Sequence, residues 1–181
     1  MNFRKEEPFV FINETPIINL KNYLEFSTIL VETGTSDGAG VKNALNFGYT
    51  DVRSVEMVQE RFEYCAKRFE SVPEVKLWLG DSRDNIADML PEERCIILLD
   101  AHPSGEGSGG HNDLMEKGEL SDFHQEKILV SEIKIALKSP NRNIIILDDT
   151  KELDPVYTSL FDNYRFEVIG GKFLECIPAE I

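Results

Sequence analysis

The sequence contains few cysteines, and no two of them are close together. Cys65, Cys95 and Cys176 are the three cysteines of the chain, and none belongs to a Cys-x-x-Cys pair. An odd number of widely spaced cysteines argues against a disulfide framework and against a structural zinc site. Each cysteine lies in an apolar pattern, as expected in a reducing compartment, and we expect a cytoplasmic protein.

Positive charge is also scarce. The chain has 19 Lys and Arg against 33 Asp and Glu, a formal net charge of -14. A nucleic-acid-binding protein needs a basic surface to displace counterions, and an anionic membrane attracts basic segments. The charge balance therefore disfavours both nucleic acid and membrane as partners.

Long hydrophobic runs are missing as well. The longest candidates, 95–99 and 144–147, have the length of strands and are too short to cross a membrane. The N-terminal residues lack the apolar segment of a signal peptide. A hydrophobic content of 41% with 29% charged residues is typical of a soluble globular protein, and 181 residues suit one domain with a sizeable core.

What the sequence does contain is a glycine-rich turn after a short apolar run. Residues 29–40 read ILVETGTSDGAG, with glycines at 34, 38 and 40. The apolar run predicts a buried strand that turns sharply into the start of a helix. Glycine lets the backbone approach a bound molecule closely, and the free N–H groups of the helix point at that molecule. This turn is therefore a predicted ligand site.

The spacing of these glycines distinguishes between classes of ligand. The dinucleotide fingerprint would need a glycine two residues after Gly34, where a serine stands, and a phosphate-binding loop would need a lysine after Gly40, where a valine follows. The arrangement Glu32-x-Gly34-x-x-x-Gly38-x-Gly40 resembles the first motif of class I S-adenosylmethionine-dependent methyltransferases. The alternative is a glycine-rich turn in some other α/β protein.

Strands alternate with helices along most of the chain. Apolar periodicity predicts strands at 28–33, 51–57, 75–80, 95–99 and 143–147, helices at 41–47, 58–69, 83–90 and 155–161, a helix that begins near 122, and a C-terminal hairpin of 166–169 and 173–177. This alternation predicts a parallel sheet covered on both faces. The resemblance implies an α/β fold, a Rossmann-like three-layer sandwich with a mostly parallel seven-stranded sheet and a C-terminal antiparallel hairpin.

The N-terminal residues 1–27 are predicted to be a packing segment in front of a single domain at 28–181. The pattern of Ile18, Leu20 and Tyr23 suggests a helix that lies over the mouth of the cofactor site. A simple packing segment without that role is the alternative.

Acidic residues stand at the carboxyl ends of the predicted parallel strands. They are Glu32, Glu56, Asp81, Asp100, Asp148 and Asp149. In an open α/β sheet, ligands bind beyond these ends, where the strand order reverses. One such acid alone would be explained as a helix N-cap, but the whole set predicts a polar ligand site at one edge of the sheet.

The resemblance to methyltransferases extends from about residue 28 to residue 177 and implies a role for each matching position. The glycine turn would lie under the methionine part of S-adenosylmethionine, and Glu32 would hold that turn or the amino group of the cofactor. The implied cofactor-binding residues are Glu32, Gly34, Thr35, Gly38, Gly40, Glu56, Met57, Asp81, Ser82 and Asp100.

The adenosine part of the cofactor would contact the ends of the next two strands. Glu56 would accept hydrogen bonds from both ribose hydroxyls, as a carboxylate does well. Met57 would pack on the adenine ring or would instead be a core residue. Asp81 would accept a hydrogen bond from the adenine amino group, with Ser82 beside it.

The methyl acceptor is expected near Asp100, Asp148 and Asp149. Three carboxylates converging without a nearby Lys or Arg would repel each other, and a hard divalent cation with oxygen ligands would relieve that repulsion. The pattern is similar to metal-dependent O-methyltransferases of the catechol and macrocin types. It implies Mg²⁺ on these three aspartates, where the metal lowers the pKa of an acceptor hydroxyl.

One position departs from the catechol type. A lysine that follows the first metal aspartate in that type is Pro103 here. His102 is the candidate general base in its place, acting with Asp100 as the catalytic pair, although it could instead order the loop. The polar, glycine-rich loop 104–118 is interpreted as a lid over the acceptor or as a segment without function.

Other residues carry weaker functional predictions. Trp78 is interpreted as a core residue rather than as a platform for substrate. Tyr157 and Phe161 are candidates for the wall of the acceptor pocket. His111 and His124 are explained as solvated polar residues.

We therefore expect an enzyme, an S-adenosylmethionine-dependent methyltransferase whose acceptor is a small hydroxylated molecule such as a sugar or phenol, with magnesium-dependent O-methylation. Two alternatives stay open: a metal-independent methyltransferase acting on a nitrogen or carboxylate, and a non-catalytic S-adenosylmethionine-binding subunit. A homodimer could complete the acceptor pocket, but no sequence feature fixes the oligomeric state.

Overall fold

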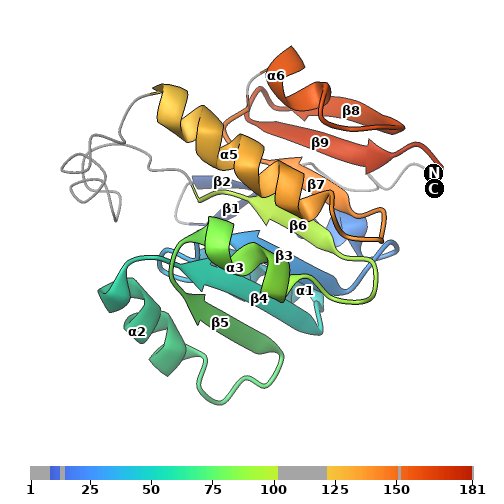
Figure 1. Cartoon of the computed structure of the whole chain (residues 1–181). Helices are drawn as coiled ribbons and strands as arrows, with labels where there is room; N and C mark the ends of the chain where they lie inside the picture. Colours follow the sequence, from blue (N-terminus) through green and yellow to red (C-terminus); the bar gives the residue numbers. More distant parts are fainter. Residues whose placement is uncertain (1–8, 13–14, 102–121, 151, 181) are drawn as a thin grey trace.

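The structure is a computed structural model of the chain, and it describes residues 9–12, 15–101, 122–150 and 152–180 (Figure 1). Each strand and helix predicted between residues 28 and 177 is present, with ends that differ by a few residues. None of the helices in the described part of the chain is both long and apolar enough to cross a membrane.

A seven-stranded sheet runs through the middle of the molecule (Figure 1). Its strands, in spatial order, are β5 (Val75–Leu79), β4 (Asp51–Glu56), β3 (Ile29–Thr33), β6 (Ile96–Leu99), β7 (Ile144–Leu147), β9 (Phe173–Pro178) and β8 (Tyr164–Ile169). The first five are parallel, and β9 runs antiparallel to both of its neighbours. The predicted α/β fold with its C-terminal antiparallel hairpin is confirmed.

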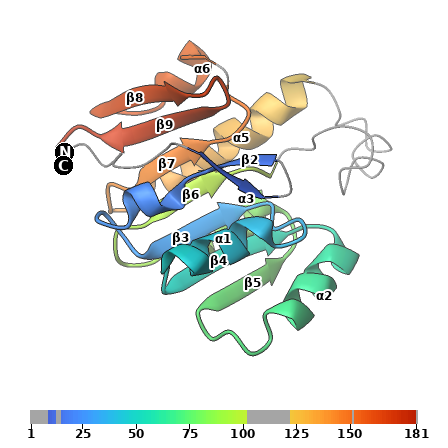
Figure 2. The same cartoon turned by 180° about the vertical axis from the view of Figure 1, so that it is seen from behind.

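Helices cover both faces of this sheet. On one face lie α1 (Ala39–Phe47) and α2 (Gln59–Arg68), which Figure 2 shows in front of the strands. On the other face lie α3 (Ser82–Met89) and α5 (Asp122–Ala136), with the short α6 (Pro155–Thr158) beside them. The arrangement is a three-layer sandwich.

The strands β6 and β7 are apolar at every position because both of their faces are buried. Along β6, Ile96 and Leu98 join the core under α1, whereas Ile97 and Leu99 join the core under α3 and α5. The four residues of β7 alternate in the same way. Successive side chains of a strand point to opposite faces, so a strand covered on both sides needs a continuous apolar run.

The N-terminal segment differs from the prediction of one helix. Two short strands, β1 (Phe9–Ile12) and β2 (Thr15–Ile18), form an antiparallel hairpin, and a 3₁₀ turn, η1 (Leu20–Tyr23), follows it. Asn19 accepts a hydrogen bond from the backbone N–H of Lys21 and starts this turn. Of the predicted helix, only the single 3₁₀ turn at Leu20–Tyr23 is present, because a proline and an asparagine in this segment favour a strand followed by a cap over a continuous helix.

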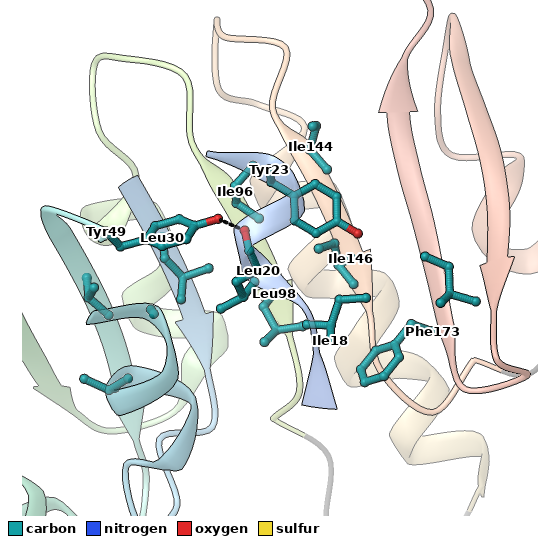
Figure 3. Packing of buried hydrophobic residues seen from close by; sticks show 14 of the residues in the cluster. Ile18, Leu20, Tyr23, Leu30, Tyr49, Ile96, Leu98, Ile144, Ile146 and Phe173 are labelled. Carbon is teal, nitrogen blue, oxygen red and sulfur yellow. Dashed lines mark hydrogen bonds between the residues drawn. The ribbon is translucent and has the colours of Figure 1, made fainter. Parts of the chain in front are cut away.

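The segment nevertheless packs on the sheet (Figure 3). Ile18, Leu20 and Tyr23 are buried in the same cluster as Leu98 and Ile146. The Tyr49 hydroxyl, which follows α1, donates a hydrogen bond to the backbone carbonyl of Leu20 at 2.9 Å, drawn as a dashed line in Figure 3. These contacts hold η1 against β6, β7 and the residues that follow α1.

Replacing Tyr23 by phenylalanine is expected to lower the free energy of unfolding by about 1–3 kcal/mol. The Tyr23 hydroxyl donates a hydrogen bond to the Glu175 carboxylate of β9, and Glu175 is only 2% exposed. The substitution removes a donor from a buried carboxylate, which costs more than the loss of an exposed hydrogen bond. Urea unfolding measures the change. Tyr64→Phe, at a side chain that is 58% exposed, is the matched control, and an equal loss in both variants would contradict the prediction.

Candidate cofactor and acceptor site

A cavity of about 340 Å³ opens at the carboxyl ends of β3 and β6. The strand order reverses between these two strands, since β4 and β5 lie on one side and β7 on the other. Such a point is the usual ligand site of an open α/β sheet. The described residues lining the cavity are Ile17, Glu32, Gly34, Thr35, Ser36, Asp37, Ala39, Gly40, Leu98, Asp100, Asp148, Lys172 and Phe173.

Three positions of the turn need glycine because a β-carbon there would lie too close to neighbouring atoms. Gly34 has φ +88°, and a β-carbon there would lie 2.5 Å from the carbonyl oxygen of Asp100. Gly38 has φ +80°, and its β-carbon would lie 2.7 Å from the ring of Phe69. At Gly40 the β-carbon would lie 1.8 Å from a carboxylate oxygen of Glu32. The glycine spacing therefore brings the end of β6 and the Glu32 side chain against the turn.

Glu32 is buried at the base of this turn. Its carboxylate accepts a hydrogen bond from the Ser54 hydroxyl at 2.8 Å, and the hydroxyls of Ser54 and Thr35 lie 2.7 Å apart. Because Ser54 donates to Glu32, Thr35 donates to Ser54. Burial raises the pKa of Glu32 from 4.5 to about 7. A cationic group that entered the cavity beside Glu32 would favour its ionised form.

Glu56 ties the turn to the end of β4. One carboxylate oxygen accepts a hydrogen bond from the Ser36 backbone N–H at 2.8 Å, and the other accepts from the Val58 N–H at 2.9 Å. Each oxygen keeps a further lone pair. Met57 is 38% exposed, so the alternative interpretation of Met57 as a core residue was wrong.

The Asp81 carboxylate interacts with the start of α3 and with Arg83. It caps α3 by accepting a hydrogen bond from the Arg83 N–H at 2.9 Å, and the Arg83 guanidinium binds the same carboxylate at 2.5 Å. Ser82 is buried behind it on the α5 side. Within the described part of the chain, Gly38, Glu56, Met57, Asp81, Ser82 and Asp149 do not line the cavity.

The cavity also contains, beside Asp148, a lysine that the sequence patterns did not indicate. The Lys172 ammonium lies 3.2 Å from one carboxylate oxygen of Asp148 and 3.9 Å from an oxygen of Asp149. The expectation that these carboxylates converge without a nearby Lys or Arg was therefore wrong. Lys172 follows the hairpin turn and is far from Asp148 in the sequence, so no local motif could have found it.

Asp100 and Asp148 form a carboxyl pair at this end of the cavity. Burial, and then the charge of Asp148 together with a hydrogen bond between the two side chains, raise the pKa of Asp100 well above its ordinary value. The Asp100 backbone N–H also donates to the Thr33 hydroxyl at 3.1 Å, which anchors the end of β6 to β3.

These residues do not fit the magnesium site implied by the resemblance to catechol-type enzymes. In the part of the chain that the structure describes, no group of three His, Cys, Asp or Glu side chains is placed to hold a metal ion. The Lys172 ammonium forms an ion pair with the Asp148 carboxylate. The Asp149 side chain is 49% exposed, and its backbone φ is +51°. Two of the three aspartates thus meet, and a lysine takes part in the cluster.

Several predicted residues have other surroundings. His102, His111 and the loop 104–118 lie outside the described residues, as does the side chain of His124. Phe161 is buried in the core under α5 and contacts the rings of Tyr164 and Phe166, with centroids 5.1 and 5.7 Å away. Trp78 and Tyr157 pack against the same core and do not line the described part of the cavity.

No model of a known protein family matches the sequence, and no curated protein matches it. Solved structures do resemble the fold. A protein named as a candidate methyltransferase, yhhF from Escherichia coli, has a TM-score of 0.56 at 13% identity, with 94% of this chain and 92% of that chain covered. A candidate caffeoyl-CoA O-methyltransferase from Staphylococcus aureus has a TM-score of 0.59 at 12% identity, with 92% and 87% covered.

A spermidine synthase solved with the transition-state analogue AdoDATO is also similar, with a TM-score of 0.51 at 10% identity. The match covers 81% of this chain and 53% of that one. At identities this low the similarity concerns the fold, and proteins of this fold have more than one reaction named for them. The chain has the α/β fold of class I S-adenosylmethionine-dependent methyltransferases.

Proposed function

We propose that this protein is an S-adenosylmethionine-dependent methyltransferase acting on a small hydroxylated molecule such as a sugar or phenol. The observation that carries the proposal is one cavity in which a buried carboxylate on a glycine turn, Glu32, faces a carboxyl pair, Asp100 and Asp148, at the switch point of the sheet. The first group suits the cationic methionine end of the cofactor, and the second suits an acceptor that must lose a proton.

The described residues divide the work of binding the cofactor. The turn from Gly34 to Gly40 brings backbone close to the methionine part, and Glu32 accepts a hydrogen bond from its amino group. Glu56 holds the turn through the Ser36 N–H and offers its remaining lone pairs to the ribose hydroxyls. We include Met57, Asp81 and Ser82 in the adenine end of the proposed site, as the resemblance implies.

In the proposed reaction the cofactor supplies a methyl group on a sulfonium. The acceptor oxygen forms a bond to that methyl carbon, the carbon–sulfur bond breaks with its electron pair on sulfur, and the hydroxyl proton passes to the Asp100 and Asp148 pair. His102 is a second candidate for this proton. The described donors do not fit a magnesium ion, so no step is assigned to a metal.

The proposal includes partners and location. A net charge of -14 supports a small-molecule acceptor over nucleic acid or an anionic membrane. Free, buried thiols at all three cysteines support a cytoplasmic location.

Calorimetric titration with S-adenosylhomocysteine tests the cofactor. We expect saturable binding, no binding of NAD, and affinity reduced about tenfold in Glu56→Gln, or ~1.4 kcal/mol. Glutamine keeps the size of the side chain but accepts hydrogen bonds at only one of its two terminal atoms. It therefore cannot accept from both ribose hydroxyls, and it also loses one of the two backbone hydrogen bonds that Glu56 accepts. Glu60→Gln, on the exposed start of α2, is the matched control.

The acceptor is tested separately with labelled S-adenosylmethionine and a panel of sugars, phenols, amines and carboxylates. Transfer to hydroxylated members supports the proposal. Transfer to amines or carboxylates alone would replace it by the metal-independent alternative, and tight cofactor binding without any transfer would favour a non-catalytic binding subunit. Preference for NAD would contradict the proposal that the protein binds S-adenosylmethionine.

A further inference from the structure

We propose that Lys172 is a positioning residue that supplies the fixed positive charge at the acceptor end, where metal-dependent enzymes of similar pattern use a divalent cation. The inference rests on the proposed function for its catalytic meaning. The site uses the ammonium group of Lys172 as its cation, so that divalent cations do not bind the aspartates of the intact protein.

The hairpin between β8 and β9 brings Lys172 to this place. Gly170 and Gly171 both have positive φ, +58° and +62°, and the Lys172 N–H donates to the Ile169 carbonyl at 3.0 Å. Two consecutive left-handed residues make a tight turn that glycine adopts without strain. Because β9 pairs directly with β7, the residue after this turn lies beside the carboxyl end of β7, where Asp148 begins the loop.

The side chain of Lys172 is held on three sides. Its ammonium contacts both carboxylate oxygens of Asp148, at 3.2 and 3.4 Å, and approaches Asp149 at 3.9 Å. The same nitrogen lies 4.9 Å from the centre of the Phe173 ring, a cation–π contact. Lys172 is 30% exposed while Asp148 is 8% exposed, so the pair is largely removed from water.

The environment of Asp148 explains why a cation is needed there. Asp148 is buried next to the carboxyl group of Asp100, and an uncompensated charge in such a place is costly. A lysine ammonium and a divalent cation both offset this charge, but they compete for the same oxygens. Since the ammonium bridges Asp148 and Asp149, a metal ion would have to displace it before using either carboxylate.

Removing the ammonium should therefore convert the cluster into a cation site. Asp100 follows β6 and Asp148 follows β7, and the two strands pair in parallel up to Leu99 and Leu147. Without Lys172, the paired carboxyl groups of Asp100 and Asp148 would present oxygen atoms from two adjacent strand ends, which is the donor type that Mg²⁺ and Mn²⁺ prefer. The expected gain of metal binding distinguishes this role from a merely structural one.

The experiment measures Mn²⁺ binding to the full chain by calorimetry with the metal alone. We expect no saturable Mn²⁺ binding to the wild-type cluster, and saturable binding to Lys172→Met that is at least about tenfold tighter than the weakest affinity the titration detects. This binding should be lost in Lys172→Met/Asp148→Asn. Lys172→Arg keeps the charge and should behave as wild type. Lys138→Met, at an exposed lysine beyond α5, is the matched control.

Saturable Mn²⁺ binding to the wild type that disappears in Asp148→Asn would overturn the proposal, and this arm does not depend on the folding of the lysine variants. Equal Mn²⁺ affinity in folded Lys172→Met and wild type would overturn it too. S-adenosylhomocysteine binding is measured on the same samples. If that ligand fails to bind any of them, the proposed function fails while the metal titration still decides the role of Lys172.

Discussion

Alanine in place of Gly40 is expected to abolish S-adenosylhomocysteine binding and to lower the free energy of unfolding by about 3 kcal/mol. A β-carbon at position 40 would lie 1.8 Å from a Glu32 carboxylate oxygen and 2.9 Å from its carboxyl carbon. Glu32 is 4% exposed, and Ser54 holds its other oxygen. Because the carboxylate cannot rotate away without losing this bond, the start of α1 must move, and the cavity wall moves with it.

The matched control for this effect is Gly48→Ala. Gly48 ends the same helix with φ +100°, and no described atom lies within 4 Å of the position its β-carbon would take. This variant has backbone strain alone, about 1 kcal/mol, and should still bind S-adenosylhomocysteine. Urea unfolding and calorimetry measure the two properties. If Gly40→Ala binds as the wild type does, the Glu32 contact with the turn is not part of the cofactor site.

The second large effect is a loss of stability as the pH rises from about 5 to about 8. Burial raises the pKa of both Glu32 and Glu132 from 4.5 to about 7. In this interval the folded protein retains protons that the unfolded chain has already released, so the free energy of unfolding falls with rising pH. The contribution is fully present below 4.5 and is lost as the pH passes about 7. Each residue contributes on the order of 3 kcal/mol to this fall.

Glu32→Gln is expected to remove the part of this pH-dependent loss of stability that comes from Glu32. A glutamine cannot ionise, yet its side-chain oxygen can still accept the Ser54 hydrogen bond, so the variant should gain stability relative to wild type at pH 8 and not at pH 5. Denaturant titrations at both pH values measure the difference. Asp88→Asn, on the exposed side of α3, is the control. A pH dependence that is unchanged in Glu32→Gln would show that the Glu32 carboxyl is not the titrating group.

The same titration should appear in cofactor binding under the proposed function. A cationic amino group beside Glu32 favours the ionised carboxylate, so binding at pH 6 should release a proton from Glu32, and affinity should rise towards pH 8. Calorimetry in buffers of different ionisation enthalpy measures this release. In Glu32→Gln the release from this group should be absent.

The central sheet and the glycine turn could be predicted from local patterns along the chain. Residues 96–99 and 144–147 are continuous apolar runs because both of their faces are covered, and this requirement is visible within each strand. Gly34, Gly38 and Gly40 are likewise a local signal, because the backbone at a strand-to-helix turn limits which residues can stand there. The acids at the strand ends were located correctly because the apolar runs show where each strand stops.

The contacts of those acids could not be predicted in this way, because they come from other parts of the folded chain. Glu32 meets Ser54 from the neighbouring strand, Asp81 is bound by Arg83, and Lys172 reaches Asp148 across the hairpin. Apolar periodicity reports which face of an element is buried, but an ion pair depends on which strands lie side by side. Lys172 stands beside Asp148 because β9 inserts between β7 and β8, and this pairing is a property of the folded sheet and not of any short stretch of sequence.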